Sequence, residues 1–415
     1  MRSCPNTHNL ERRVRRLVIG GVVGATLLAT APGSADAATV NGPDMEMPFP
    51  CADVWNGRTF LGHSPSTRAI DWNKTNDLGA PTVSSAPGVV TSAVDLGTRS
   101  YGRYVVVDHG GGWSTLYAHL NAIWSTPGQA VDQGTILGLV GSSGGSTGPH
   151  LHFEERYNRV DQQPYFHRDF FRMGTTVASA NCGDSPVIGD WDGNGTSNVG
   201  VLRRFAASRF VLKRPGQKAL RIGYGLPTDQ PISGDWDGDG HVDVGVRRPG
   251  IMGFVLRRKD GTEKQVSLGR LSDFGITGDW DGNGITDLGV WHPSTRLFTL
   301  RAANGNTTTL TFGSLGDRPV TGDWNGDGRT DLGVFTASTS TFTLRSVSKR
   351  GALTTQKVVW GNPSSLPVAG DWNGDGIGDI GVLNPSTAKF SLRLSPTAAH
   401  KTITVRTSTW GYPRG

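Results

Sequence analysis

The chain has 415 residues, 59 of them Gly, and a formal net charge of +6. This length exceeds what one ordinary hydrophobic core accommodates, so two or three domains are expected. Frequent Gly between short apolar runs favours an all-β protein. The basic excess is small, and part of it lies in the first 37 residues, so the charge gives no indication of nucleic acid binding.

Residues 1–37 have the pattern of an export signal. Four arginines between positions 12 and 16 precede an apolar run over residues 17–31, and Ala35-Asp36-Ala37 then supplies a small-x-small cleavage site. The run is shorter than the roughly 20 residues that span a bilayer, which disfavours a membrane anchor. We therefore predict a secreted protein, extracellular or associated with the cell wall, without membrane contact after cleavage.

Two cysteines, Cys51 and Cys182, remain after the signal. An even pair in an oxidising compartment favours a disulfide over the alternative of two free thiols. The pair brackets all the candidate catalytic residues described below. We predict a lead-in over residues 38–50 and a compact antiparallel β domain over residues 51–182, because short apolar runs separated by Gly and Pro recur there without a helical period.

The most informative stretch of this domain covers residues 148–154. On a strand, side chains alternate between faces, so His150, His152 and Glu154 share one face while Leu151 and Phe153 share the other. Such a strand packs its apolar face on a core and presents two imidazoles side by side. This arrangement is typical of half a zinc site, although polar surface is the commoner reason for such a pair.

Three further residues supply the missing partners. His63 and Asp71 lie in one segment, and His119 lies in Tyr117-Ala118-His119-Leu120. A hydrolytic zinc site takes three protein ligands from His, Asp or Glu and leaves a fourth position open. Four histidines and an aspartate in one small domain exceed what a purely structural role requires.

With these motifs in order, the segment 51–172 resembles the lysostaphin/LytM-type zinc metallopeptidases that cut peptidoglycan peptides. The resemblance implies that His63, Asp71 and His152 bind zinc, and that His119 and His150 act beside the metal. It does not assign separate roles to these two histidines. The matching features are His63…Asp71, residues 79–90, residues 117–120, Gly141-Ser142-Ser143-Gly144 and residues 148–154.

Seven residues separate His63 from Asp71, more than is common in the family, so Asp77 is an alternative ligand that requires another strand register. His109 is expected to be structural and His167 to lie on the surface. For Glu154 we favour a solvated strand carboxylate over a group that supports a ligand.

From residue 183 onward one signature recurs five times, beginning at Gly189, Gly234, Gly278, Gly322 and Gly370, with spacings of 45, 44, 44 and 48 residues. Each copy predicts four strands. This period with four strands indicates propeller blades, so we predict five repeats over residues 183–415, which close into a five-bladed β-propeller in preference to an open array.

The repeats resemble FG-GAP/VCBS-type repeats. Their carboxylates at odd positions of a Gly-rich loop suit Ca²⁺, in a structural role. Asn198 replaces the ninth-position Asp in the first repeat, and turns stabilised by Asp and Asn without metal are the alternative. The repeated Trp is expected to pack between blades, with sugar stacking as the alternative. The predicted calcium ligands are Asp190, Asp192, Asn194, Asp235, Asp237, Asp239, Asp243, Asp279, Asp281, Asn283, Asp287, Asp323, Asn325, Asp327, Asp331, Asp371, Asn373, Asp375 and Asp379.

Together these features predict a secreted zinc metalloendopeptidase acting on peptidoglycan peptides, with a calcium-stabilised propeller that targets it, through wall carbohydrate as one option. We expect a monomer. Two alternatives stay open: a general secreted protease acting on Gly-rich proteins, and a non-enzymatic partner or activator of wall hydrolases. The complete set of five site residues argues against the non-enzymatic alternative.

Overall fold

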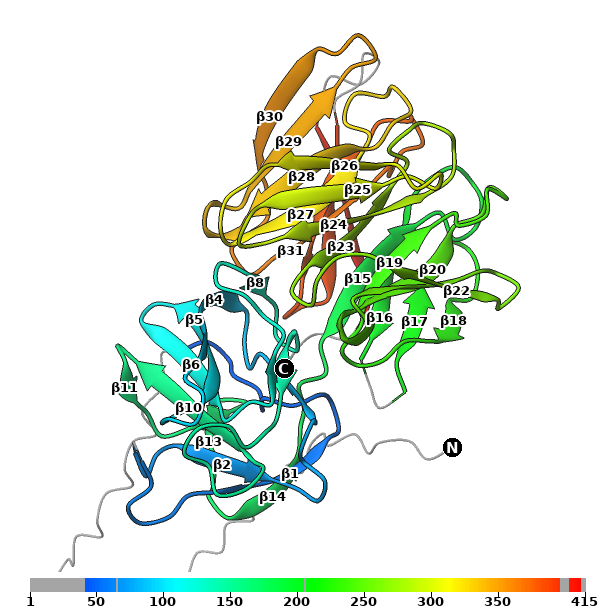
Figure 1. Ribbon diagram of the computed structural model, residues 1–415. Coiled ribbons are helices and arrows are strands. Elements are labelled where there is room, and N and C mark those ends of the chain that lie inside the picture. The colour runs from blue at the N-terminus through cyan, green and yellow to red at the C-terminus, as the bar shows by residue number, and fades with distance from the viewer. Residues whose placement is uncertain (1–41, 65, 205–206, 396–402, 412–415) are drawn as a thin grey trace, which may run out of the picture. The chain divides into compact units, whose positions relative to one another are not determined.

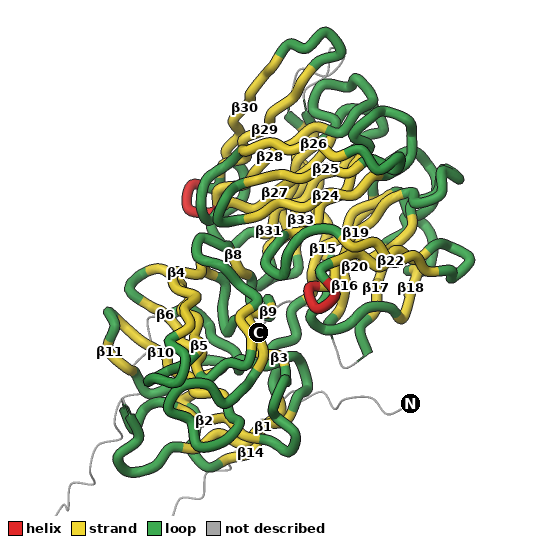
Figure 2. The backbone as a smooth tube through the Cα atoms, in the orientation of Figure 1, coloured by secondary structure: helices red, strands yellow, loops and turns green. Residues whose placement is uncertain are grey.

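A computed structural model describes residues 42–64, 66–204, 207–395 and 403–411 (Figure 1). The predicted signal peptide lies outside these residues. Strands dominate these described residues, and the two helical elements among them are the short 3-10 turns η1 (Pro249–Ile251) and η2 (Ala337–Thr339) (Figure 2). Within the described ranges, no helix is both long and apolar enough to cross a membrane. The all-β prediction is confirmed.

The N-terminal part of the described chain contains one large sheet and two small ones. The large sheet has nine strands in the order β14-β1-β2-β10-β6-β5-β4-β8, with β11 paired to β10. The small sheets are β3-β9-β7 and β12-β13. The strands are β1 (Val54–Arg58), β2 (Ile70–Asn73), β3 (Pro81–Val83), β4 (Gly88–Asp95), β5 (Arg103–Gly110), β6 (Trp113–Ala118), β7 (Ala122–Ile123), β8 (Ala130–Val131), β9 (Ile136–Leu139), β10 (Leu151–Tyr157), β11 (Val160–Asp161), β12 (Tyr165–Phe166), β13 (Asp169–Phe170) and β14 (Thr175–Ala178).

The core of this region forms on one face of the large sheet. Leu151 and Phe153 of β10 are fully buried in it, as the alternation of the strand predicts. Phe49, from the predicted lead-in, stacks on Trp55 with ring centroids 3.8 Å apart, so the lead-in is part of this core. The predicted disulfide is present between Cys51 and Cys182 and closes the region.

Each of the five repeats forms its own four-stranded antiparallel sheet, with its strands in chain order. The prediction of four strands per repeat is therefore confirmed. The strands are β15 (Asp184–Gly189), β16 (Asn198–Arg203), β17 (Arg209–Leu212), β18 (Leu220–Gly223), β19 (Gln230–Gly234), β20 (Asp243–Arg248), β21 (Gly253–Arg257), β22 (Glu263–Ser267), β23 (Phe274–Gly278), β24 (Asp287–His292), β25 (Leu297–Arg301), β26 (Thr307–Thr311), β27 (Asp317–Gly322), β28 (Asp331–Thr336), β29 (Thr341–Val347), β30 (Leu353–Val359), β31 (Leu366–Gly370), β32 (Asp379–Asn384), β33 (Lys389–Leu394) and β34 (Thr404–Thr409).

The repeated Trp residues lie in hydrophobic clusters that join neighbouring sheets. Trp191 of the first repeat packs in a cluster with Val244 and Val246 of the second. Trp372 of the fifth repeat lies in a cluster with Val199 and Val201 of the first. Burial of indole rings between sheets is a large apolar contribution, and it explains why each repeat retains a Trp at this position. The expected packing role of these residues is thus confirmed.

Candidate metal and catalytic site

Strand register brings Asp71 and His152 together. Strand β10 pairs antiparallel with β2, and His152 lies directly opposite Asp71 in that pairing. On its other side β10 pairs with β6, where His152 is opposite Ala118. His119 follows Ala118 at the end of β6, so three neighbouring strands deliver three of the predicted site residues to one spot.

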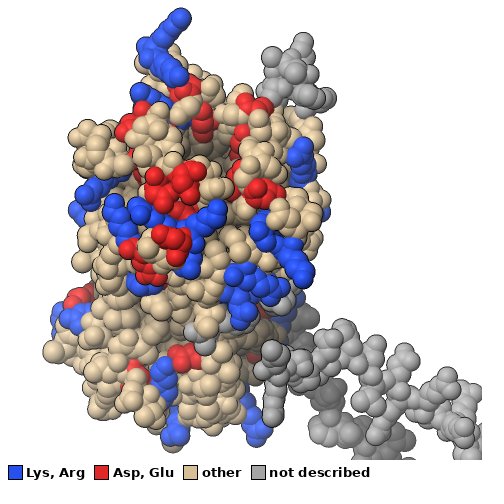
Figure 3. All heavy atoms as spheres, turned by 90° about the vertical axis from the view of Figure 1, so that its right-hand side faces the viewer, with Lys and Arg blue, Asp and Glu red and all other residues tan. Residues whose placement is uncertain are grey.

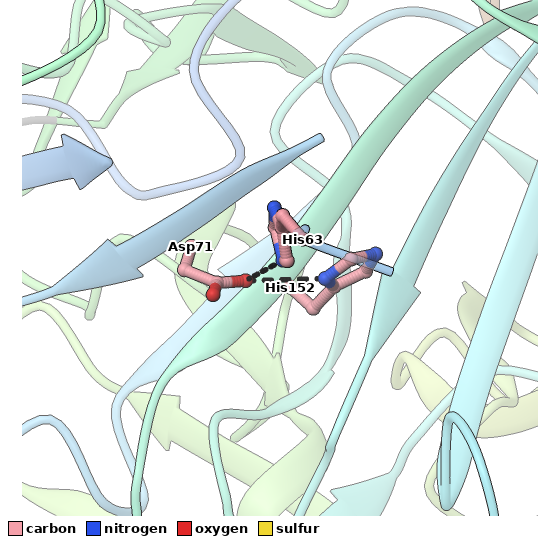
Figure 4. Close-up of side chains that lie close together, drawn as sticks. All are labelled: His63, Asp71 and His152. Carbon is pink, nitrogen blue, oxygen red and sulfur yellow. Dashed lines mark hydrogen bonds and ion pairs between the residues drawn. The ribbon is translucent and has the colours of Figure 1, made fainter. Parts of the chain in front are cut away.

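His63 completes this cluster from the loop between β1 and β2. Figure 4 shows the Asp71 carboxylate pointing toward the rings of His63 and His152, with a contact to each. Oδ1 of Asp71 lies 3.1 Å from Nε2 of His63 and 3.1 Å from Nδ1 of His152. One ligand atom from each residue lies within 4.8 Å of the other two. Two imidazoles and a carboxylate, close together and shielded from solvent, fit the donor set of a zinc site.

The electrostatics of the cluster favour an ionised aspartate. Burial by itself raises the pKa of Asp71, but hydrogen bonds with His152 and His63 and the nearby His150 outweigh it, so the pKa falls well below its usual range. A carboxylate that is charged at neutral pH is ready to bind a cation. Asp77, the alternative ligand, lies outside the described cluster of ligand atoms.

His119 and His150 lie beside the cluster, and a backbone carbonyl holds the ring of each. Their ring centroids are 4.9 Å apart. The backbone carbonyl of Ser143 accepts a hydrogen bond from Nδ1 of His119 (2.8 Å), and the carbonyl of Gly148 accepts one from Nδ1 of His150 (2.9 Å). Because a carbonyl only accepts, Nδ1 carries a proton in both rings, so Nε2 is the nitrogen that holds the lone pair when a ring is neutral.

The backbone of His119 adopts a left-handed conformation with φ of 60°. This region is uncommon for a residue other than Gly and is found often at functional positions. Burial lowers the pKa of His119 to about 4, so the ring is neutral at physiological pH in the metal-free protein. A neutral ring with a free Nε2 is suited to accept a proton.

Glu154 departs from expectation, because its side chain is not solvated. The side chain is 0% exposed. Its Oε1 lies 2.8 Å from Nε2 of His152 and accepts a hydrogen bond from the Tyr101 hydroxyl, also at 2.8 Å. Its Oε2 accepts a hydrogen bond from Nε of Arg156 (2.6 Å). The prediction of a solvated carboxylate is wrong, since these three partners compensate the charge that the strand buries.

This contact orients His152, because the ring nitrogen that faces Glu154 is not the one that faces Asp71. A carboxylate that fixes the outer nitrogen of a metal-binding histidine sets the tautomer and raises the basicity of the ligating nitrogen. His152, Glu154 and Arg156 are polar residues at alternating positions of β10, so they share one face of the strand. This alternation is the sequence signal for the contacts among them. No sequence signal identified Tyr101.

Replacing Glu154 by Gln should weaken zinc binding by about 10- to 100-fold. The change keeps the shape of the side chain but removes the charge that fixes His152. Competition with a chromogenic chelator measures the affinity. Glu155→Gln is the matched control, because this neighbouring carboxyl is also fully buried but contacts the backbone N–H of Tyr165 and not His152. Equal zinc affinity in both variants would contradict the role of Glu154.

The two remaining histidines of this region take no part in the site. His109 is held by Pro87 O at 2.9 Å and by the Thr115 hydroxyl at 2.8 Å, so both ring nitrogens are engaged. This confirms its structural role. His167 is 46% exposed and forms an ion pair with Glu46, which agrees with its predicted surface position.

In the repeat loops, the first Asp organises the turn. The carboxylate of Asp279, for example, accepts backbone hydrogen bonds from Gly282, Asn283 and Gly284. The ninth-position Asp287 joins two segments, because its oxygens accept bonds from the backbone N–H groups of Trp280 and Ala303. These hydrogen bonds stabilise the turns without a metal ion, which is what the alternative prediction of Asp- and Asn-stabilised turns requires.

Two of the loops also gather carboxylate oxygens within 4.8 Å of one another. These groups are Asp235, Asp237 and Asp239 in the second repeat and Asp279, Asp281 and Asp287 in the third. Oδ1 of Asp281 is buried and has no hydrogen-bond partner among the described residues. Several clustered oxygens with an unused acceptor are compatible with a hard cation such as Ca²⁺.

Comparison with known proteins agrees with this geometry. Residues 66–164 match the model of Peptidase family M23. Over 86 residues the chain is 48% identical to the DD-carboxypeptidase/endopeptidase Mpg of Neisseria meningitidis, which is 21% of this chain and 19% of that protein. Over 98 residues it is 39% identical to the peptidoglycan DD-endopeptidase ShyA of Vibrio cholerae, 22% of each chain. Among solved structures, a zinc-containing peptidase from Vibrio cholerae is 26% identical, with a TM-score of 0.24, over 29% of this chain and 39% of that one.

The chain therefore carries an M23 peptidase domain near its N-terminus. Its candidate zinc site is His63, Asp71 and His152. The matched segment contains Asp71 and His152, whereas His63 lies just before it. The chain spans about a fifth of the length of the curated relatives named above. The match to the family model ends at residue 164, before the first repeat.

Proposed function

We propose that this protein is a zinc metalloendopeptidase that hydrolyses peptide bonds of bacterial peptidoglycan. The observation that carries the proposal is the complete site, in which three ligand atoms within 4.8 Å of one another lie beside two histidines with matching tautomers. The names of Mpg and ShyA supply the substrate class, since both are endopeptidases and ShyA is named for peptidoglycan.

Each residue has a definable task in this reaction. His63, Asp71 and His152 would hold the zinc, and Glu154 would orient His152. Zinc, when bound, supplies a Lewis acid that polarises the scissile carbonyl and makes a water molecule more acidic. His119 and His150 each have an Nε2 that carries the lone pair when the ring is neutral, so either can accept the proton of the attacking water and pass it to the leaving amine nitrogen. While it holds that proton, the imidazolium stabilises the negative charge that develops on the carbonyl oxygen.

Mass spectrometry of fragments released from purified peptidoglycan of defined composition tests the proposal. We expect cleavage products whose masses identify one kind of peptide bond and which disappear when a chelator is added. Cleavage of unrelated Gly-rich proteins at a similar rate would favour the general protease instead. Absence of any product, with zinc bound, would favour the non-enzymatic alternative.

We further propose that the protein is exported and that residues 1–37 are removed. The disulfide between Cys51 and Cys182 supports an extracytoplasmic location, because such bonds persist in oxidising compartments. The expected domain boundaries, at residues 51–182 and 183–415, are part of this proposal. The burial of Phe49 in the first core extends that domain into the lead-in.

For the repeats we propose a closed five-bladed propeller of the FG-GAP/VCBS type. Its support is the hydrophobic cluster that the first and fifth sheets share. A backbone hydrogen bond from Ser197 N to Asp371 O (2.7 Å) also joins the first repeat to the fifth. Equivalent bonds join Thr286 to Asp235 and Thr330 to Asp279 between neighbouring repeats, so the last link has the form of the others.

We propose that the repeat loops bind Ca²⁺, so calcium should raise the melting temperature. Binding at a hundredfold excess over Kd stabilises the folded state by about 2.7 kcal/mol per site. Differential scanning calorimetry with and without Ca²⁺ measures the effect. Asp237→Asn combined with Asp239→Asn should reduce the shift, whereas Asp260→Asn, in an exposed turn of the same repeat, should not. An unchanged melting temperature in the original protein would contradict calcium binding.

A further inference from the structure

A cleft of about 600 Å³ lies between the first and second repeat sheets. Figure 3 shows basic and acidic side chains gathered on the side of the molecule where these sheets lie. The basic residues that line the cleft are Arg214, Arg221, Arg257, Arg258 and Lys259. They outnumber the three carboxylates of the lining, which are Asp190, Asp192 and Asp243.

The repeats themselves provide an internal control for this charge. In every repeat the third strand has a Leu that pairs with a Gly of the second strand, and the residue after this Leu is basic. In the first repeat the Leu is Leu212 and the basic residue is Lys213. The residue after this basic residue differs between repeats: it is Arg in the first two repeats and uncharged in the other three. The residues at this position are Arg214, Arg258, Ala302, Ser346 and Leu394.

The neighbouring strand adds a second difference. Arg221 of β18 lies opposite Val211 in the first sheet. Its counterparts are Gln265, Thr309, Lys357 and Thr407. Arg214 and Arg258 therefore add positive charge to the first two sheets, and Arg221 adds more to the first, whereas repeat four has a charge only at the position of Arg221. The repeat fold does not require these charges. A feature that the fold does not require points to a ligand.

Some charged groups of the cleft are engaged by the protein, including one basic group, because Nε of Arg258 lies 3.4 Å from Oδ2 of Asp237. The carboxylate of Asp190 accepts three backbone hydrogen bonds, from Gly193, Asn194 and Gly195. Asp243 is buried. Arg221 and Lys259, by contrast, are exposed to solvent. The surface that a ligand meets is consequently basic.

We propose that this cleft binds a flexible polyanion with phosphodiester linkages and no bases, of the poly(glycerol phosphate) type found in a cell wall. Basic groups on both walls of the cleft suit a chain with regularly spaced negative charges. Trp191 is the only Trp, Tyr or Phe among the described residues of the lining, and it is 8% exposed within a hydrophobic cluster. The exposed ring of the lining is the single imidazole of His241, so these lining residues lack the row of aromatic side chains on which successive bases stack, and this disfavours single-stranded nucleic acid. That the ligand is a polymer of the cell wall rests on the proposed function as a wall hydrolase. That the cleft binds a polyanion does not rest on it.

Binding of fluorescently labelled poly(glycerol phosphate) to the full chain tests the proposal. We expect affinity that falls as salt rises, and an Arg221→Glu/Lys259→Glu variant that binds about tenfold more weakly or worse. The matched control is Lys357→Glu/Arg350→Glu, which reverses the charge at the same strand position and in the corresponding turn of the fourth repeat. The control variant should bind as the original protein does.

Three outcomes would overturn the proposal: no binding, equal loss in both variants, or equally tight binding of single-stranded DNA. Cleavage of a soluble peptide substrate should be the same for all three proteins, because neither variant alters the site around Asp71. Absence of binding by the original protein, with its peptide cleavage intact, contradicts the cleft proposal alone. Failure of peptide cleavage in the original protein contradicts the proposed peptidase function instead.

Discussion

Replacement of His152 by Ala should yield a folded protein that retains no zinc and no longer degrades peptidoglycan. The change removes one of the three ligand atoms gathered around Asp71 Oδ1. It also deprives Glu154 of one of its three partners. Since metal-assisted hydrolysis depends on several kcal/mol of transition-state stabilisation, we expect kcat/KM to fall by about 10³-fold or more.

Zinc content measured by atomic emission, together with the rate of wall solubilisation, checks this result. His167→Ala is the control, because that side chain is half exposed and lies outside the cluster. Circular dichroism should show that both variants remain folded. If His152→Ala kept one zinc per chain, the assignment of His152 as a ligand would be wrong.

Replacement of His119, unlike replacement of His152, should leave zinc binding intact and impair only catalysis. His119→Ala should keep its zinc and lose about 10²- to 10⁴-fold in kcat, the usual contribution of a positioned acid or base. The residue has a left-handed backbone, so His119→Asn is a useful second variant, because Asn tolerates that conformation better than most residues. His150→Ala should behave in the same way, since its tautomer is set by the same kind of contact.

The decisive comparison is zinc content against rate in the same preparation. Both His119 variants should bind zinc with the stoichiometry of the original protein. Normal wall degradation by these variants would remove His119 from the reaction, and loss of zinc would instead make it a ligand.

Sequence reasoning reached the ligand set because the chemistry of this site is local to short motifs. Strand alternation around His152 predicted which side chains face the core, and the buried Leu151 and Phe153 confirm it. The strand register that places His152 opposite Asp71 joins residues far apart in the chain, so alternation alone did not provide it. The resemblance to a known family supplied that link.

Glu154 shows where such reasoning fails. A carboxylate on a strand face is usually solvated, and the favoured prediction followed that tendency. Its burial depends on Tyr101, which is distant in sequence and whose hydroxyl reaches it across the sheet. Tertiary packing of this kind leaves no periodic signal, although Arg156 two residues further on was a local hint.

In the repeats, the period predicted the number and composition of the sheets because each unit folds from its own sequence. The partnership of the first and fifth sheets was not visible in the period, since an open array has the same repeat length. The uneven charge of the first two repeats was visible, but its position in one cleft required the structure.

The most direct test of the peptidase function is metal reconstitution. Protein stripped with a chelator should be inactive on purified peptidoglycan, and titration with zinc should restore the rate, with a plateau at one zinc per chain. Full activity of the stripped protein, or no recovery at any zinc content, would contradict a catalytic zinc held by His63, Asp71 and His152.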